Sequence, residues 1–177
     1  MEFRTPVHIA PFGFRIGLSH KGLLVGSCFA DRIGRIMRNH KLPVTVNPFG
    51  TLFNPASIAA TLKRLEERRS YDAGDLTRYE ERWISFDHHG AFDGSDCKQT
   101  LRRINEALET GAEALRTADR LFLTFGTARV YERQGEVVAN CHRRPAAEFA
   151  RRRLSVDEIA DAISELAEGP LAGRSIL

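Results

Sequence analysis

Residues 23–30 read LLVGSCFA, and this stretch decides the expected fold. Residues 23–25 have the apolar character of a buried strand, and Gly26 permits the tight turn that would end it. Apolar residues then repeat at helical spacing through residues 30–40. A strand followed at once by a helix is the repeating unit of open α/β sheets, so Ser27 is expected at the carboxyl end of a strand and the N-terminus of a helix.

Two neighbouring side chains of this turn can carry chemistry. The amides and the positive dipole end of a helix N-terminus favour an alkoxide, an oxyanion or a bound anion, which makes Ser27 a candidate nucleophile. Serine is also a preferred helix N-cap, and the residues alone leave both roles open. Cys28 is a rival nucleophile because helix N-termini favour thiolates. We nevertheless expect Cys28 to be a small buried apolar side chain, as free cysteines often are.

The rest of the chain alternates strand and helix signals, which is the pattern of a mostly parallel sheet covered by helices. Short apolar and β-branched runs predict the strands, at 23–25, 43–46 and 121–125. Apolar stripes at helical spacing and capping residues predict the helices, at 30–40, from 55 onward, at 96–118 and at 155–168.

Three regions depart from this alternation. Residues 70–94 are irregular and rich in Asp, Gly and aromatic residues, and so long a loop inside a compact domain is more often functional than idle. Residues 128–132 and 137–140 predict a hairpin on the rim of the sheet. Residues 169–177 show neither a strand nor a helix pattern, so we expect an atypical tail there.

Composition bounds the class of protein. A chain of 177 residues with 42% apolar content is expected to form one domain, residues 1–177. The net charge of +3 is modest, and the densest basic cluster is residues 151–153. No aromatic residues interleave a basic stripe, so we expect solvated helix faces and loop ends, and no nucleic-acid partner.

Cysteine usage and hydropathy indicate the compartment. The 3 cysteines cannot all pair within one chain. The sequence shows neither an apolar signal segment nor an apolar run long enough to span a bilayer. We therefore expect a cytoplasmic location and no membrane insertion.

Residues 26–30 spell GSCFA, and the chain resembles the GSCFA domain proteins, which are similar to the SGNH (GDSL-type) hydrolases. The resemblance runs in family order from the N-terminus to about residue 167. The other stretches that carry it are FRTP (3–6), NPFG (47–50), NP (54–55), SFDHH (85–89), GTA (126–128), VY (130–131) and NCH (140–142).

The resemblance implies a three-layer α/β/α, flavodoxin-like parallel sheet. SGNH-type domains carry five parallel strands, with a serine after the first, a glycine after the second, an asparagine motif after the third and an Asp-x-x-His near the C-terminus. Here the strand signals give only three parallel strands, and no Asp-x-x-His follows residue 140. Because an open sheet must be covered and paired, we expect a sheet that is incomplete at its C-terminal side and a chain truncated relative to the family.

The resemblance also implies roles for single residues. Ser27 corresponds to the nucleophile and Gly50 to an oxyanion-hole amide, although from the residues alone Gly50 is equally a turn glycine. The third oxyanion donor is open, because GTAR at 126–129 stands where the superfamily has Gly-x-Asn-Asp. The alternatives are the hydroxyl of Thr127 and the side-chain amides of Asn47, Asn54 and Asn140.

Three histidines are the remaining candidates for the site. His88 and His89, with Asp93 nearby, are metal-ligand types, but adjacent residues of a strand-like stretch face opposite ways, so we expect no metal. One of the two is expected to line a pocket and contact substrate, and the other to be solvated. His142 is either a loop histidine bonded to the neighbouring backbone or a pocket residue beside Asn140.

The expected function is that of an SGNH-like serine ester hydrolase that needs no cofactor. Ser27 would attack an acyl or acetyl ester on a carbohydrate or lipid, with impaired activity because no general base is identified. One alternative is a non-catalytic ligand- or carbohydrate-binding domain, in which the Ser27 turn and Gly50 hold an anion or a sugar. The other is an inactive fragment that self-associates through an exposed sheet edge.

Overall fold

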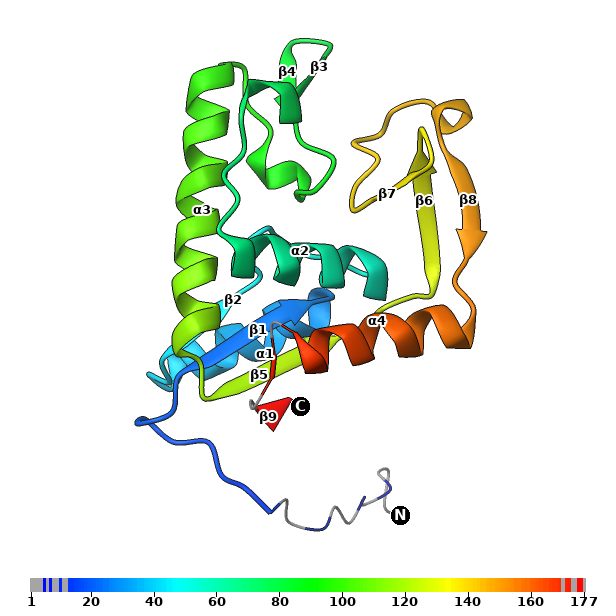
Figure 1. Ribbon diagram of the computed structural model, residues 1–177. Helices are drawn as coiled ribbons and strands as arrows, with labels where there is room; N and C mark the ends of the chain where they lie inside the picture. The colour runs from blue at the N-terminus through cyan, green and yellow to red at the C-terminus, as the bar shows by residue number, and fades with distance from the viewer. Residues whose placement is uncertain are drawn as a thin grey trace.

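The computed structural model describes residues 13–169 together with 5, 7, 10, 171, 172, 175 and 176. It has an α/β fold, in which helices flank a parallel sheet (Figure 1). The sheet contains β1 (Gly22–Gly26), β2 (Val44–Val46), β5 (Arg120–Thr124) and β9 (Ser175–Ile176). The helices are α1 (Cys28–Asn39), α2 (Pro55–Glu67), α3 (Cys97–Thr117) and α4 (Val156–Glu168).

The strand order of this sheet is β2-β1-β5-β9, with every neighbouring pair parallel. Counted along the chain, that order is 2-1-3-4, the beginning of the flavodoxin-like order. The chain passes from β1 to β2 on one side and later enters β5 on the other, with Leu23 opposite Leu121 and Gly26 opposite Thr124. The point where the strand order reverses therefore lies between the carboxyl ends of β1 and β5.

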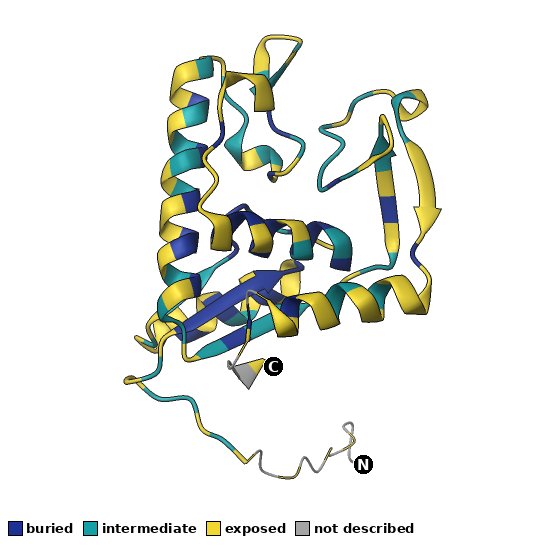
Figure 2. Cartoon of the chain, viewed as in Figure 1, coloured by how far each residue is buried: buried dark blue, intermediate teal, exposed yellow. Residues whose placement is uncertain are grey.

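Both faces of the sheet are covered, which explains why β1 is apolar throughout. Leu24 packs with Ala30 and Met37 of α1 on one face. Leu23 and Val25 face the opposite way, into the larger core formed with α2, α3 and α4. The three layers are therefore α1, the sheet, and the remaining helices, and the burial of the whole of β1 follows from this arrangement (Figure 2).

Antiparallel strands form the rim. The predicted hairpin is confirmed as β6 (Arg129–Arg133) and β7 (Glu136–Val138). A third strand, β8 (Ala150–Arg153), pairs with the other side of β6. The three arginines at 151–153 are solvated, as expected, but they lie in this exposed edge strand, so their expected place on a helix face or loop end is wrong. The strand was not predicted because a strand is recognised by alternating apolar residues, and three successive arginines show no such alternation.

The irregular region at 70–94 contains short ordered elements. A two-stranded hairpin forms from β3 (Thr77–Tyr79) and β4 (Arg82–Ile84). Single 3₁₀ turns flank it at η1 (Ala73–Asp75) and η2 (Gly90–Phe92), and η3 (Ala146–Glu148) precedes β8. Histidines 88 and 89 lie in the turn before η2, not in a strand.

The C-terminal residues correct a second expectation. Residues 175 and 176 form β9, which pairs in parallel with β5, so the sheet has a fourth strand where the sequence predicted an atypical tail. Leu171 is also buried in the larger core. The sequence could not predict β9, because two residues are too few to show a periodic pattern and the strand forms by pairing with β5. Residues 3, 4 and 6 of the FRTP stretch lie outside the described residues.

Within the described part of the chain, no helix has the length and apolar character needed to cross a membrane.

Candidate functional site

Ser27 and Thr124 meet at the point where the strand order reverses. Ser27 is the N-cap of α1, and its Oγ accepts a hydrogen bond from the Phe29 amide at 3.3 Å. Its own N–H lies 3.0 Å from the Thr124 carbonyl oxygen and 2.9 Å from Thr124 Oγ1. The two hydroxyl oxygens are 3.0 Å apart, and Ser27 is only 6% exposed. The serine is therefore both the cap and one member of a hydroxyl pair.

Thr124 was not among the residues predicted for the site. It ends β5, and the pairing of β5 with β1 places it opposite Gly26. A Cβ on Gly26, which has φ of +144°, would collide with the Thr124 carbonyl oxygen. The only sequence signal for Thr124 was its position at the carboxyl end of a predicted strand, which is where ligands meet open α/β sheets.

The side chain of Asn47 forms hydrogen bonds that hold the turn next to Ser27. Its Oδ1 accepts from the Gly26 amide at 2.8 Å, and its Nδ2 donates to Asp31 Oδ1 at 2.8 Å. Asn47 is buried and takes a left-handed φ of 44°, which asparagine tolerates better than most residues. The amide proposed as an oxyanion donor thus bridges the end of β1 and the first turn of α1.

The predicted oxyanion amides already have acceptors in this structure. The N–H of Gly50 donates to the Asn47 carbonyl oxygen at 2.8 Å, just as that of Ser27 donates to Thr124. Gly50 has φ of +83°, and a Cβ there would collide with Cβ of His89. Cys28 provides another amide beside Ser27, because it opens α1, where an N–H has no acceptor within the helix.

Thr127 and Asn54, the next two candidates for the third oxyanion donor, lie in different parts of the structure. Thr127 Oγ1 accepts from the Arg129 amide at 3.0 Å, which leaves the Thr127 hydroxyl hydrogen as a donor. Asn54 caps α2 and makes two hydrogen bonds to Ser57, through its Oδ1 at 2.8 Å and its Nδ2 at 3.0 Å. Its amide therefore serves the helix, as the capping pattern predicted.

Cys28 differs from its expectation. We expected a small buried side chain, but the thiol-bearing residue is exposed, so that prediction is wrong. The reason is its place in the first turn of α1, on the side turned away from the core residues Ala30 and Met37.

His88 is enclosed by aromatic rings. Its ring centroid lies 4.3 Å from that of Phe49, 4.9 Å from Tyr71 and 5.0 Å from Phe92. Nδ1 is 2.8 Å from Ser85 Oγ, whereas the buried Nε2 has no hydrogen-bond partner among the described residues. Burial, with smaller contributions from the charges of Arg64 and His142, lowers the pKa of His88 to about 3. His88 is therefore neutral at physiological pH.

His142 is held at both ring nitrogens. Nε2 is 2.7 Å from the Ser85 carbonyl oxygen, and Nδ1 lies 3.1 and 3.2 Å from the two Asp93 carboxylate oxygens. A carbonyl oxygen and a carboxylate both accept hydrogen bonds, so a ring N–H of His142 finds an acceptor at either nitrogen. Asn140 completes the group, because its Oδ1 accepts from the His142 amide at 3.0 Å and its Nδ2 donates to the His88 carbonyl at 3.3 Å.

The sequence model of the GSCFA family matches residues 21–170. The chain belongs to the GSCFA family. The matched segment runs from the start of β1 past the end of α4 and contains every candidate site residue. No curated protein and no solved structure matches the chain.

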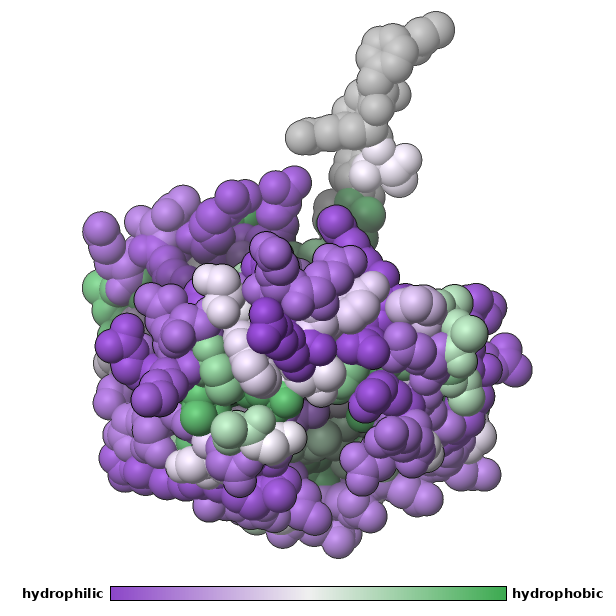
Figure 3. Space-filling view, turned by 90° about the horizontal axis from the view of Figure 1, so that it is seen from above, coloured by the Kyte–Doolittle hydropathy of each residue, from purple (hydrophilic) through white to green (hydrophobic). Residues whose placement is uncertain are grey.

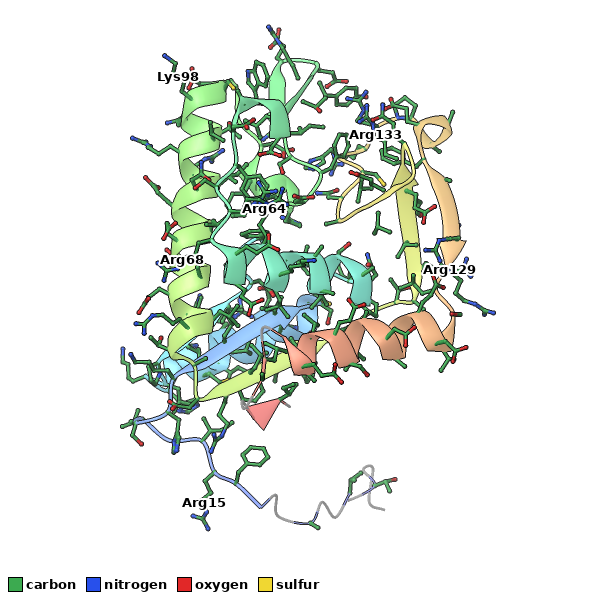
Figure 4. The ribbon with its side chains drawn as sticks, in the orientation of Figure 1. Arg15, Arg64, Arg68, Lys98, Arg129 and Arg133 are labelled. Carbon is green, nitrogen blue, oxygen red and sulfur yellow. The ribbon has the colours of Figure 1, made fainter. Side chains whose placement is uncertain are left out.

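Two cavities of this GSCFA chain border the 70–94 region, one against α2 and β7 and the other against residues 140–143. The first is about 570 Å³ and is lined by Arg64, Tyr71, Ser85 and Asp87, among others. Arg64 rises from α2 toward this space (Figure 4), with its guanidinium carbon 3.6 Å from the Tyr71 ring centroid. From above, the surface is mostly hydrophilic around a hollow with apolar residues at its bottom (Figure 3).

The second cavity brings together three of the predicted site residues. It is about 550 Å³, and His89, Asn140 and His142 all line it, together with Asp93 and Arg143. His89 is exposed and its Nδ1 accepts from the Ala91 amide at 3.2 Å. Ser27 lines neither cavity, so the serine and the histidine group are separate features of the structure.

The surroundings of Ser27 are instead aromatic. Phe29, Phe53 and Phe125 are all exposed. Phe53 and Ser27 both border Gly126, because a Cβ there would lie 3.1 Å from Phe53 Cδ1 and 3.5 Å from Ser27 Cβ. The Phe53 carbonyl oxygen also accepts from the amide of Gly126 at 2.8 Å. Apolar surface therefore borders the hydroxyl pair.

Proposed function

We propose that this GSCFA domain is a serine ester hydrolase of the SGNH-like type, with Ser27 as its nucleophile and an acyl or acetyl ester as its substrate. One observation carries the proposal. The hydroxyls of Ser27 and Thr124 lie 3.0 Å apart across the reversal point of the sheet, at the carboxyl ends of β1 and β5. Open α/β folds bind their ligands in that position.

In the proposed reaction, Ser27 Oγ forms a bond to the ester carbonyl carbon. The bond from that carbon to the alcohol oxygen then breaks, and the serine proton passes through a general base to the departing alcohol. In this proposal, the Cys28 amide and the positive end of α1 stabilise the oxyanion, since both lie at the N-terminus of the helix that follows Ser27. Water releases the acyl group from the serine in the second half of the reaction.

The proposal assigns no residue as the general base. Among the described residues, the hydrogen-bond partners of Ser27 Oγ are the Thr124 hydroxyl and the Phe29 amide, and no histidine or carboxylate is one of them. His142 is held by Ser85 and Asp93 instead. A serine without a base is a weak nucleophile, so we expect slow turnover from this chain.

A non-catalytic ligand-binding domain is the second candidate. It is favoured by the lack of a general base, because Ser27 Oγ contacts no histidine or carboxylate in the described part of the chain. A domain that only binds has no need of an activated hydroxyl. Activity that depends on Ser27 separates the two candidates.

Labelling with a fluorophosphonate tests the proposal, because the probe requires an activated serine but no particular substrate. The unmodified chain and the Ser27→Ala variant would be compared, with Ser70→Ala as the matched control because Ser70 is an exposed serine away from the turn. We expect slow labelling of the unmodified chain and of the control, and none of Ser27→Ala. A folded chain that stays unlabelled, or labelling that survives in Ser27→Ala, would contradict the proposal.

A further inference from the structure

The edge strand β8 carries arginines that face other arginines. In the register of β6 and β8, Arg153 lies directly opposite Arg129, and Arg151 lies opposite Tyr131. Directly paired residues share a face, as do alternate residues of one strand, so these four side chains lie on one face of the ribbon. Like charges placed directly opposite each other destabilise a sheet. Arg129 lies near the end of β8 that leads to α4 (Figure 4).

On the opposite face of the same ribbon, the positive charge of Arg152 is paired with carboxylates. Arg152 donates to Glu132 at 2.7 Å and to Glu158 of α4 at 2.7 Å. In contrast, no carboxylate of the described residues forms an ion pair with Arg129, Arg151 or Arg153. The guanidinium carbon of Arg151 lies 5.9 Å from the Tyr131 ring centroid instead. One face is thus internally paired, and the other presents three unpaired positive charges.

The outer side of β8 is also an open hydrogen-bonding edge. The order of the rim sheet is β7-β6-β8, so in the part of the chain that the structure describes only one side of β8 has a partner strand. All four residues of β8 are exposed. A second copy of this strand fits the edge poorly, because its sequence ARRR would set arginine against arginine.

We propose that the open edge of β8 binds an acidic, extended segment of a partner protein by strand addition. The added backbone would pair with the free edge, and acidic side chains at alternate positions would lie beside Arg151 and Arg153. Charge complementarity selects an acidic strand over a second copy of the chain. This surface is independent of Ser27, so the interaction stands whether or not the domain is a hydrolase.

A fluorescein-labelled peptide of alternating Thr and Glu, about eight residues long, is the probe. Fluorescence anisotropy at low salt should show saturable binding to the full chain that weakens as salt is added. The Arg151→Glu/Arg153→Glu variant should bind the peptide at least about tenfold more weakly. Arg32→Glu/Arg35→Glu is the matched control, because it changes the same net charge at exposed positions of α1 and should bind like the unmodified chain.

Further arms separate strand addition from simple charge attraction. The same peptide N-methylated at every residue keeps its charges but has no N–H to donate from either edge, so it should lose binding. Equal binding of both peptides, or equal loss in the α1 control, would overturn the proposal. Tighter, β8-dependent binding of single-stranded DNA or of vesicles rich in phosphatidylserine would also overturn it, because the face would then recognise phosphate.

Discussion

At the scale of single residues, Asn47 shows how the serine turn is built. Asn47→Asp keeps an acceptor for the Gly26 amide but places a carboxylate where an N–H now donates to Asp31 at 2.8 Å. Asn47 is 7% exposed whereas Asp31 is exposed, so water screens the repulsion between the two carboxylates from the Asp31 side only. We expect Asn47→Asp to lower the free energy of unfolding at pH 7 by about 2 kcal/mol, measured by urea denaturation.

A charge-swapped variant is the control for this prediction. In Asn47→Asp/Asp31→Asn the donor and the acceptor exchange places, so the carboxylate again faces an amide and most of the lost stability should return. A double variant as unstable as Asn47→Asp alone would show that the Asn47–Asp31 hydrogen bond does not hold the turn.

At the scale of elements, the chain after α4 belongs to the core. Leu171 is 1% exposed and packs in the same cluster as Leu166, whose carbonyl oxygen accepts from the Leu171 amide at 2.9 Å. Leu171→Ala should lower the free energy of unfolding by about 3 kcal/mol, because it leaves a cavity in a packed site. Ile176 of β9 is 36% exposed and is the matched comparison. Equal losses for Leu171→Ala and Ile176→Ala in chemical denaturation would show that Leu171 is not packed as described.

The same elements show how much of the fold the sequence predicts. β1 and α1 to α4 follow from apolar runs, helical spacing and caps, such as the box formed by Ser155 and Glu158, which the structure contains. β8 and β9 could not be predicted this way, because one consists largely of arginines and the other has two residues. Both strands form by pairing with a strand that is distant in sequence, and local sequence patterns do not indicate such a partner.

At the scale of the whole molecule, the candidate site depends on contacts between distant segments. Ser27 was predicted from its own turn, but its partner Thr124 is supplied by a strand 97 residues later. The sequence likewise placed His142 beside Asn140, whereas its contacts with Ser85 and Asp93 depend on how the rim meets the 70–94 region. Residue types predicted the candidates, and tertiary packing decided which of them meet.

The aromatic enclosure of His88 joins three such segments, and it predicts how acid affects the fold. Phe49 follows β2, Tyr71 follows α2 and Phe92 ends η2. Burial lowers the pKa of His88 to about 3, so the folded state keeps it neutral where the unfolded chain, with a pKa of about 6.5, binds a proton. The unfolded state therefore binds more protons between these values, and stability must fall as the pH falls below about 6.5.

The slope should approach about 1.4 kcal/mol per pH unit from this residue alone. His88→Phe removes the titration and, although it also loses the bond to Ser85 at every pH, its stability should change less between pH 7 and pH 5 than that of the unmodified chain. The difference should reach about 2 kcal/mol in urea denaturation at the two pH values. His40→Gln, at an exposed histidine, should keep the steeper dependence of the unmodified chain. Parallel profiles for the unmodified chain and His88→Phe would mean that His88 already takes up its proton in the folded protein.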